Sequence, residues 1–244
     1  LSFGQAEVSV VRSSVSGEDD YGVTDEASRL NLNFADRESI RKLLLAVGAA
    51  KEDNADKLSA AIYDWRVYGE SEIQGFSSDD SYDNLQYPYP PKKANFETLD
   101  ELRLVQGVTE KVFENLVDYV TIYGTKEINI NTASWPVLVA VGFSEEQGKM
   151  VETMRRGVDG IEGTVDDTFF QNSDTLVDGL GKALGLGQED IDQLRLTIER
   201  IPFVFTSDIF RIQSVAQLVS RKENKSITCV FDTNGDKIIF WRER

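Results

Sequence analysis

Two loops rich in carboxylates are the part of this sequence best suited to chemistry, because clustered oxygens can bind a divalent cation. The first loop spans 69–89 and contains no lysine or arginine. Calcium suits it, since this ion accepts about six to eight oxygen ligands in loose geometry. The alternative is a solvated acidic loop. The candidate ligands are Glu70, Glu72, Asp79, Asp80 and Asp83, with Asp64 at the end of the preceding predicted helix.

The second acidic loop, 159–167, combines four carboxylates with Gly160 and Gly163, which let the backbone fold tightly. Its spacing differs from the twelve-residue EF-hand loop at most positions. One hypothesis is a calcium loop, and the other is a capped turn in which Asp166 or Asp167 begins the next helix. The candidate ligands are Asp159, Glu162, Asp166 and Asp167.

The composition argues against an enzyme. With no histidine, the chain can build neither a Ser-His-Asp triad nor a histidine-based zinc site. Its single cysteine, Cys229, lies in an apolar stretch typical of a buried residue. Carboxylate pairs can hydrolyse glycosides, so a calcium-dependent extracellular adhesive or carbohydrate-active domain is one alternative. We interpret Trp65, Trp135 and Trp241 as core or interface anchors.

The formal net charge of −16 limits the classes of partner. Nucleic-acid affinity depends largely on lysine and arginine neutralising phosphates, so a nucleic-acid partner is disfavoured. An anionic membrane surface is disfavoured for the same reason. No apolar run approaches the roughly 18 residues needed to cross a bilayer. Proteins and divalent cations are the expected partners.

Strand patterns lie at both ends of the chain and helical patterns lie between them. Alternation predicts a strand over 7–12 and a strand or extended segment over 30–34. β-branched and aromatic residues predict strands over 202–211, 215–221, 226–231 and 237–241. Asn234-Gly235 is a hairpin signal, so the last three strands should form an antiparallel meander. We therefore predict an α+β fold, one sheet interrupted by an all-α insertion.

One local pattern recurs in the helical zone: an apolar helix end, a glycine, an apolar residue and a polar start to the next helix. This predicts helix-hairpin-helix units, because a left-handed glycine ends one helix and the following apolar residue packs back. Such units often bind nucleic acid, which is a second alternative function. Acidic residues follow most of these glycines, so we expect packing modules instead. The glycines are Gly48, Gly107, Gly142 and Gly185.

Several segments, in order along the chain, resemble the K-type minor pseudopilins of the bacterial type II (general) secretion pathway. The matching segments are Asp25-Glu26 followed by Leu30 to Asn33, Asp64-Trp65, Tyr89, Asn95 to Leu102 with Gly107, Ile128 to Ala133, and the closing Ile238 to Glu243. One departure is that Arg66, Val67 and Tyr68 follow Asp64-Trp65, where the family often has further acids.

The resemblance implies a pilin-like sheet split by SAM-like helix-hairpin-helix units. The expected domains are 1–34 and 201–244, which form the sheet, and 35–200, which form the insertion. It also implies a non-catalytic subunit at the pseudopilus tip, bound to I-type and J-type minor pseudopilins. Calcium occurs in the family after the Asp-Trp helix, with Asp79 and Asp80 near the position of a family acid. This chain would be the periplasmic domain of a protein anchored in the Gram-negative inner membrane by an N-terminal helix outside it.

Overall fold

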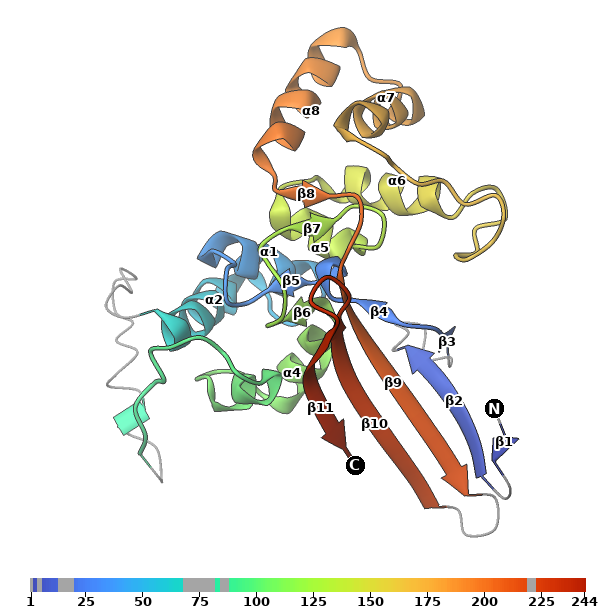
Figure 1. Cartoon of the computed structure of the whole chain (residues 1–244). Coiled ribbons are helices and arrows are strands. Elements are labelled where there is room, and N and C mark those ends of the chain that lie inside the picture. Colours follow the sequence, from blue (N-terminus) through green and yellow to red (C-terminus); the bar gives the residue numbers. More distant parts are fainter. Residues whose placement is uncertain (1, 4–5, 13–19, 68–81, 84–87, 219–222) are drawn as a thin grey trace.

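The computed structural model describes residues 2–3, 6–12, 20–67, 82–83, 88–218 and 223–244. An antiparallel sheet forms one part of the molecule, and the helices gather around one end of it (Figure 1). The predicted α+β class is therefore confirmed. No helix in the described ranges is long and apolar enough to cross a membrane.

The main sheet joins the two ends of the chain. Its strands follow the order β1-β2-β9-β10-β11, and all neighbours are antiparallel. β2 from the N-terminal end pairs with β9 from the C-terminal end. The short β3 (Asp20–Tyr21) and β4 (Thr24–Asp25) pair with β2 and β9. The strands are β1 (Ser2–Phe3), β2 (Ala6–Arg12), β9 (Ile209–Leu218), β10 (Glu223–Asp232) and β11 (Lys237–Glu243).

The C-terminal meander of β9, β10 and β11 confirms the predicted arrangement, but one predicted boundary is wrong. We expected separate strands over 202–211 and 215–221, whereas β9 runs unbroken over Ile209–Leu218. Gln213 and Ser214 resemble a turn in sequence. Both are instead paired in register with β2 and β10, because polar side chains are tolerated on a sheet face that is not fully covered.

The helical part lies between β4 and β9 and contains two small parallel strand pairs. β5 (Leu30–Asn31) pairs with β6 (Val120–Thr121), and β7 (Ile128–Asn129) pairs with β8 (Phe203–Val204). The 3-10 helices are η1 (Glu26–Ser28), η2 (Leu99–Leu104) and η3 (Val117–Tyr119). The α-helices are α1 (Arg37–Ala46), α2 (Glu52–Arg66), α4 (Glu110–Leu116), α5 (Trp135–Val141), α6 (Glu145–Arg155), α7 (Ser173–Leu184) and α8 (Gln188–Arg200).

Local sequence signals explain where these helices begin and end. Ser144 and Gln147 form the predicted capping box of α6. Gly185, in the left-handed conformation at φ 62°, ends α7. The segment before Gly107 is the 3-10 helix η2. The elements joined at the four recurring glycines are therefore not uniform.

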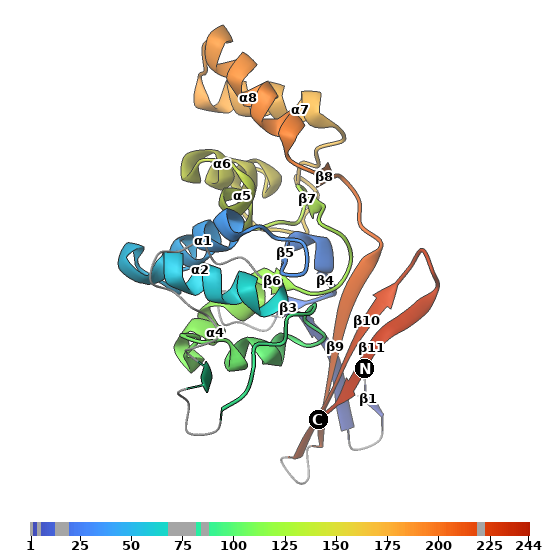
Figure 2. The ribbon, with the colours of Figure 1, turned by 90° about the vertical axis from the view of Figure 1, so that its left-hand side faces the viewer.

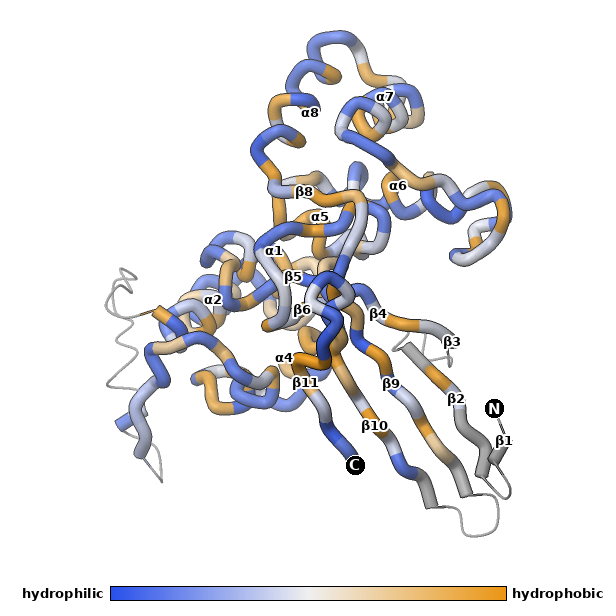
Figure 3. The backbone as a smooth tube through the Cα atoms, in the orientation of Figure 1, coloured by the Kyte–Doolittle hydropathy of each residue, from blue (hydrophilic) through white to orange (hydrophobic). Residues whose placement is uncertain are grey.

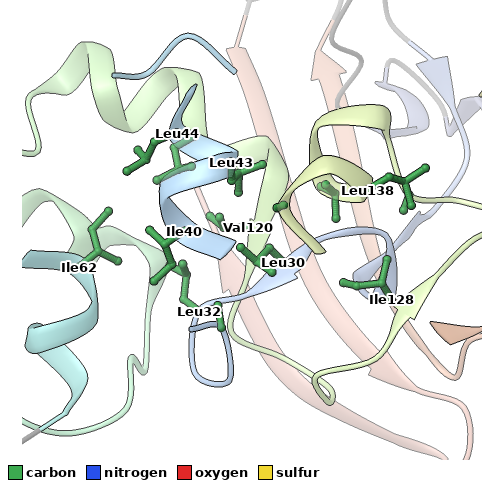
Figure 4. Packing of buried hydrophobic residues seen from close by; sticks show 14 of the residues in the cluster. Leu30, Leu32, Ile40, Leu43, Leu44, Ile62, Val120, Ile128 and Leu138 are labelled. Atoms are coloured by element: carbon green, nitrogen blue, oxygen red, sulfur yellow. The ribbon is translucent and has the colours of Figure 1, made fainter. Parts of the chain in front are cut away.

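The hydrophobic core lies in the helical part rather than in the sheet. Residues of α1, α5, β6 and β7 converge there, as Figure 4 shows for Leu43, Leu44, Leu138, Val120 and Ile128. Each of these side chains is essentially inaccessible to solvent. Burying such a side chain stabilises a fold by about 1.5 to 3 kcal/mol. The helices are therefore held by a continuous core, to which Trp65 also belongs.

The two faces of the main sheet have different environments. Directly paired residues of neighbouring strands point to the same face, so Ile212, Cys229 and Trp241 share one face. Cys229 is buried among strands, as predicted, but Trp241 is 51% exposed. The adjacent row, which contains Val230 and Phe240, points to the other face. Figure 2 shows the helices on one side of the described sheet only.

The covered face is the one that contacts the helical part. The Phe240 ring packs on Tyr123 with centroids 5.8 Å apart. Arg242, two residues along β11 and on the same face, donates to Asp100 of η2 at 3.0 Å. The opposite face, with Trp241 and the partly exposed Val10, is left open over the described strands.

Candidate functional site

Asp25 is the residue at which the main sheet and the helical part meet. It is the last residue of β4, where its backbone pairs with Phe210 of β9. Its Oδ2 accepts hydrogen bonds from Asn129 Nδ2 at 2.9 Å, Thr132 Oγ1 at 2.5 Å and Ser207 Oγ at 2.7 Å. One side chain therefore joins β4, β7 and the segment leading into β9.

Glu26 makes a second link from the next position. Its side chain is fully buried, and its Oε1 lies 2.6 Å from Arg211 Nε of β9. Its Oε2 accepts a hydrogen bond from Thr121 of β6. Burial lowers the pKa of nearby Arg29, the charge of Arg211 lowers it further, and Glu26 opposes both effects. Together, Asp25 and Glu26 fix both strand pairs of the helical part against the sheet.

The segment Leu30 to Asn33 forms a turn held by its two asparagines. Asn31 Oδ1 accepts from the Asn33 amide at 3.0 Å, and Asn31 Nδ2 donates to Tyr123 O at 2.9 Å. The Asn33 side chain makes two hydrogen bonds to the backbone of Phe96. Its Oδ1 accepts from the Phe96 amide at 2.8 Å, and its Nδ2 donates to the Phe96 carbonyl at 3.0 Å. A distant chain segment is thereby attached to the start of α1.

The segment Ile128 to Asn131 makes the same set of contacts. Asn129 Oδ1 accepts from the Asn131 amide at 3.0 Å. Asn131 accepts from the Phe170 amide at 2.8 Å and donates to the Phe170 carbonyl at 2.8 Å. Asn131 Nδ2 also donates to Phe205 O at 3.0 Å. The helical part thus uses one polar arrangement twice, before α1 and before α5.

An arginine completes each arrangement. Arg66, at the end of α2, donates to the carbonyls of Asn33 and Ala35. Arg155, at the end of α6, donates to the carbonyls of Ile130 and Ala133 at 2.9 and 2.6 Å. Burial lowers the pKa of both guanidinium groups. The departure at Arg66 from the family pattern therefore has a structural role, because this cation binds the carbonyls of Asn33 and Ala35 just before α1.

In the sequence, an acidic stretch follows each of these arginines. Glu70, Glu72, Asp79 and Asp80 of the first loop lie outside the described residues. Asp64 is 3% exposed within α2, and Asp83 is exposed. Burial raises the pKa of Tyr82 to about 12, and the charge of Asp64 adds to this shift. Asp64 and Tyr82 flank, in sequence, the part of the first loop that lies outside the described residues.

An aromatic cluster forms the base of that loop. The Tyr82 ring lies 6.0 Å from Trp65 and 5.4 Å from Tyr89. Trp65 Nε1 donates to Glu101 Oε2 at 3.3 Å, and the Tyr82 hydroxyl accepts from the Gln106 amide at 2.9 Å. The sequence prediction that Trp65 is a core anchor is confirmed. Trp135 is only partly buried, and Trp241 lies on the open sheet face.

In the second loop the carboxylates bind the loop's own backbone. Asp166 Oδ2 accepts from the amides of Val158 and Asp159 at 2.6 and 3.1 Å, and Asp166 Oδ1 accepts from the Thr164 hydroxyl at 2.7 Å. These bonds lower the pKa of Asp166 to about 2, with the Thr164 hydroxyl contributing most. Asp167 Oδ2 accepts from the Gly163 amide at 2.6 Å.

The helix-start hypothesis for Asp166 or Asp167 is wrong. α7 begins only at Ser173, with Asn172 as its cap. The two aspartates instead close the loop on itself, because free amides in the tight turn lie nearer than any helix end. Glu162 lies 3.6 Å from Arg155 and 3.5 Å from Arg156.

The described residues contain no group of three or more acidic, cysteine or histidine side chains placed to hold a metal ion. In the second loop, the oxygens of Asp166 accept from two amides and a hydroxyl. Calcium in the second loop stays a prediction. For the first loop, only Asp64 and Asp83 are described, so calcium there stays a prediction.

Sequence reasoning missed the buried polar residues at the junction between the sheet and the helices. Asn31 and Asn33 entered the strand prediction over 30–34, and all of Asn31, Asn33, Asn129 and Asn131 entered the family resemblance, but none was predicted to join distant segments. The signal was present as two Leu/Ile-Asn-Leu/Ile-Asn segments, each followed by an alanine and a helix cap. Repetition of one polar pattern about a hundred residues apart indicates a repeated structural unit.

Comparison with known proteins gives a family match over part of this chain. Residues 23–125 match the family model described as "Type II secretion system (T2SS), protein K". The type II secretion system protein K of Pectobacterium carotovorum subsp. carotovorum is 29% identical over 129 residues, which is 51% of this chain. The chain spans only 39% of the length of that relative.

One solved structure is similar to this chain over its whole length. A chain in the crystal structure of the GspK-GspI-GspJ complex from the enterotoxigenic Escherichia coli type 2 secretion system superposes with a TM-score of 0.68. The match covers 100% of this chain and 82% of that one, at 13% sequence identity. At this identity the match establishes a shared fold. Together with the family match, it confirms the predicted resemblance to the K-type proteins of type II secretion.

Proposed function

We propose that this chain, which carries a type II secretion system protein K domain over residues 23–125, is a non-catalytic minor pseudopilin that joins partner minor pseudopilins at the pseudopilus tip. The proposal rests on one observation above all. Asp25 and Glu26 attach the helical part rigidly to one face of the sheet, while the opposite face stays open. A subunit built in this way can assemble through its sheet and carry the helices as a fixed cap.

The open sheet face supports the assembly half of this proposal. Trp241, Val10 and Ile238 are exposed apolar residues of the described strands. A pilin-like subunit would cover this face with its own N-terminal helix and with I-type and J-type neighbours. Burial of apolar surface is the main favourable term in such association. We propose that the main sheet serves assembly and that the helical part, with its strand pairs β5-β6 and β7-β8, serves capping.

The helical part supports the capping half. α7 and α8 lie at the opposite end of the molecule from the far ends of β9 and β10 in both views (Figures 1 and 2). Bulk placed there would leave no room for another subunit above this one. We interpret the helix pairs joined at Gly48, Gly142 and Gly185 as helix-hairpin-helix packing units of the SAM-like type.

The nucleic-acid alternative is poorly supported by the same helix pairs. Binding would need cations beside the free amides that begin the second helix of each pair. The first turns of α6 and α8 instead carry Glu145, Glu146, Glu189 and Asp190. These carboxylates would face the phosphates and repel them.

We further propose that calcium binds the first acidic loop and fixes it to the end of α2. The candidate ligands are those of the first loop together with Asp64, which is buried near the end of α2. Ligand linkage predicts stabilisation of about 2.7 kcal/mol when calcium is at a hundredfold excess over its dissociation constant. A thermal melt with calcium and then with excess chelator measures this. Identical melting temperatures would rule out the metal.

The partner proposal is tested by mixing this chain with the periplasmic domains of the I-type and J-type minor pseudopilins. Size-exclusion chromatography at about ten micromolar should show one complex that contains all three chains. A matched Trp241→Asp variant should weaken the complex without unfolding the chain, because Trp241 is exposed on the open face. Three separate elution peaks for the unmodified chain would contradict the proposal.

A further inference from the structure

The second acidic loop exposes apolar side chains that its own fold does not use. Val158 is 98% exposed and Val165 is fully exposed, while Ile161 is 60% and Phe169 is 67% exposed. All four lie within twelve residues, between α6 and α7. Single exposed apolar residues need no explanation, but several gathered on one loop mark an interaction site.

The loop holds these side chains in a fixed arrangement. Asp166 binds the amides of Val158 and Asp159, which brings the two sides of the loop together next to Val158 and Val165. The Thr168 amide donates to Arg155 O at 3.0 Å and closes the base of the loop. A preorganised loop loses little conformational freedom on binding, so its exposed apolar surface is available for association at low entropic cost.

Negative charge surrounds this apolar tip. Asp159 and Asp166 are exposed beside Val158 and Val165. Arg155 does not offset the negative charge of these two aspartates at the surface, because it is buried and donates to the carbonyls of Ile130 and Ala133. Arg156 lies 3.5 Å from Glu162 and is balanced by it. The rim of the tip is therefore acidic, and a complementary surface must be basic.

We propose that this loop tip, formed by Val158, Ile161, Val165 and Phe169, docks into an apolar groove of a second protein whose rim carries lysine or arginine. The tip projects sideways from the end of α6, beside the helical part and apart from the strands β9, β10 and β11 that the assembly proposal uses (Figures 1 and 3). Docking at the tip is therefore independent of pseudopilin assembly. A lipid surface is the less suitable occupant, because acidic side chains beside the tip oppose an anionic headgroup layer.

The test uses defined peptide probes and amide chemical shifts of the whole chain. A ten-residue peptide of alternating leucine and lysine should shift the amides of 157–169 with a micromolar midpoint. A serine/lysine peptide of equal charge should bind at least tenfold more weakly, and a leucine/glutamate peptide should not bind. Equal binding by the serine/lysine peptide would reduce the effect to charge alone and overturn the proposal.

Matched variants locate the effect on the chain. The double change Val158→Ser and Val165→Ser should weaken leucine/lysine binding at least tenfold, and both positions are exposed, so the fold should survive. Leu196→Ser, at an exposed apolar position of α8, should leave the affinity unchanged. The proposal fails if the double variant binds as tightly as the unmodified chain. It also fails if that variant loses binding to neutral phosphatidylcholine vesicles, because the tip would then be a lipid anchor.

The same double variant separates this inference from the assembly proposal. It should form the complex with the I-type and J-type domains as well as the unmodified chain does. Loss of peptide binding with the complex retained supports a separate docking surface, whereas loss of both would assign the tip to assembly and overturn its independence.

Discussion

Arg211 Nε lies 2.6 Å from Glu26 Oε1 and joins the central strand β9 to the 3-10 helix η1. The carboxylate is fully buried, whereas the guanidinium is 21% exposed. Glu26 also accepts from Thr121 and lies near the buried cation Arg29. The contact between sheet and helices thus includes a network of charges beside the aromatic contact of Phe240 with Tyr123, and such networks are costly to break.

Replacing Glu26 by glutamine should destabilise the protein strongly. Arg211 and Arg29 would then be left without the carboxylate that balances them, and uncompensated buried charge costs about 3 to 5 kcal/mol. Denaturant unfolding measures the change. Glu52→Gln is the matched control, because Glu52 pairs with Arg41 at an exposed site and should change stability by less than about 1 kcal/mol. Equal effects of the two changes would refute a special role for Glu26.

Asn33→Ala and Asn131→Ala should destabilise the protein to a similar extent. Each change leaves the amide and carbonyl of one phenylalanine, Phe96 or Phe170, without a partner. Unsatisfied buried groups cost about 1 to 3 kcal/mol. The measurement is the free energy of unfolding, with Gln193→Ala on the exposed side of α8 as a control expected within about 0.5 kcal/mol. A neutral result for either asparagine would show that the two arrangements are not equivalent.

Gly157→Ala and Gly160→Ala separate backbone strain from steric clash in the second loop. Both glycines have positive φ, 62° and 73°, so each change should cost about 1 kcal/mol in backbone conformation. A Cβ at Gly157 would also lie 2.5 Å from Asp166 O, whereas one at Gly160 meets nothing within 4 Å. Gly157→Ala should therefore be the more damaging change and should shift the amide resonances of Val158 and Asp159. Identical spectra for the two variants would argue against the closed loop.

The closed second loop should persist to low pH. The pKa of Asp166 falls to about 2 in the folded protein, against about 3.9 for an ordinary aspartate. The stabilisation from its hydrogen bonds is fully present above about pH 4 and is lost as the pH falls through about 2. The amide shifts of Val158 and Asp159 should titrate with a midpoint near 2. A midpoint near 4 would mean that the carboxylate is not held by these amides.

The sequence predicted the broad organisation because that organisation depends on local signals. The strand at 7–12, the hairpin at Asn234-Gly235 and the cap at Ser144 all follow from short-range patterns, and the structure confirms them. The error at β9 arose because Gln213 and Ser214 are polar and resemble a turn. Their pairing with β2 depends on a partner more than two hundred residues away, which periodicity does not encode.

The junction between the sheet and the helices was beyond sequence reasoning for the same reason. Asp25 meets Asn129 and Ser207 only after the chain has folded. The carboxylates of 159–167 form local contacts instead, and these were not predicted either. Their composition suggested a cation site, but Asp166 binds amides within its own loop, and composition alone does not distinguish these uses of the same oxygens.

Hydrogen–deuterium exchange of this chain alone and in a mixture with the I-type and J-type domains tests the central claim most directly. If the sheet assembles and the helices cap, amides of β9, β10 and β11 should become protected, while α7 and α8 should exchange as they do in the free chain. Protection of α7 and α8 without change in the sheet, or no protection anywhere at saturating partner concentration, would contradict the account.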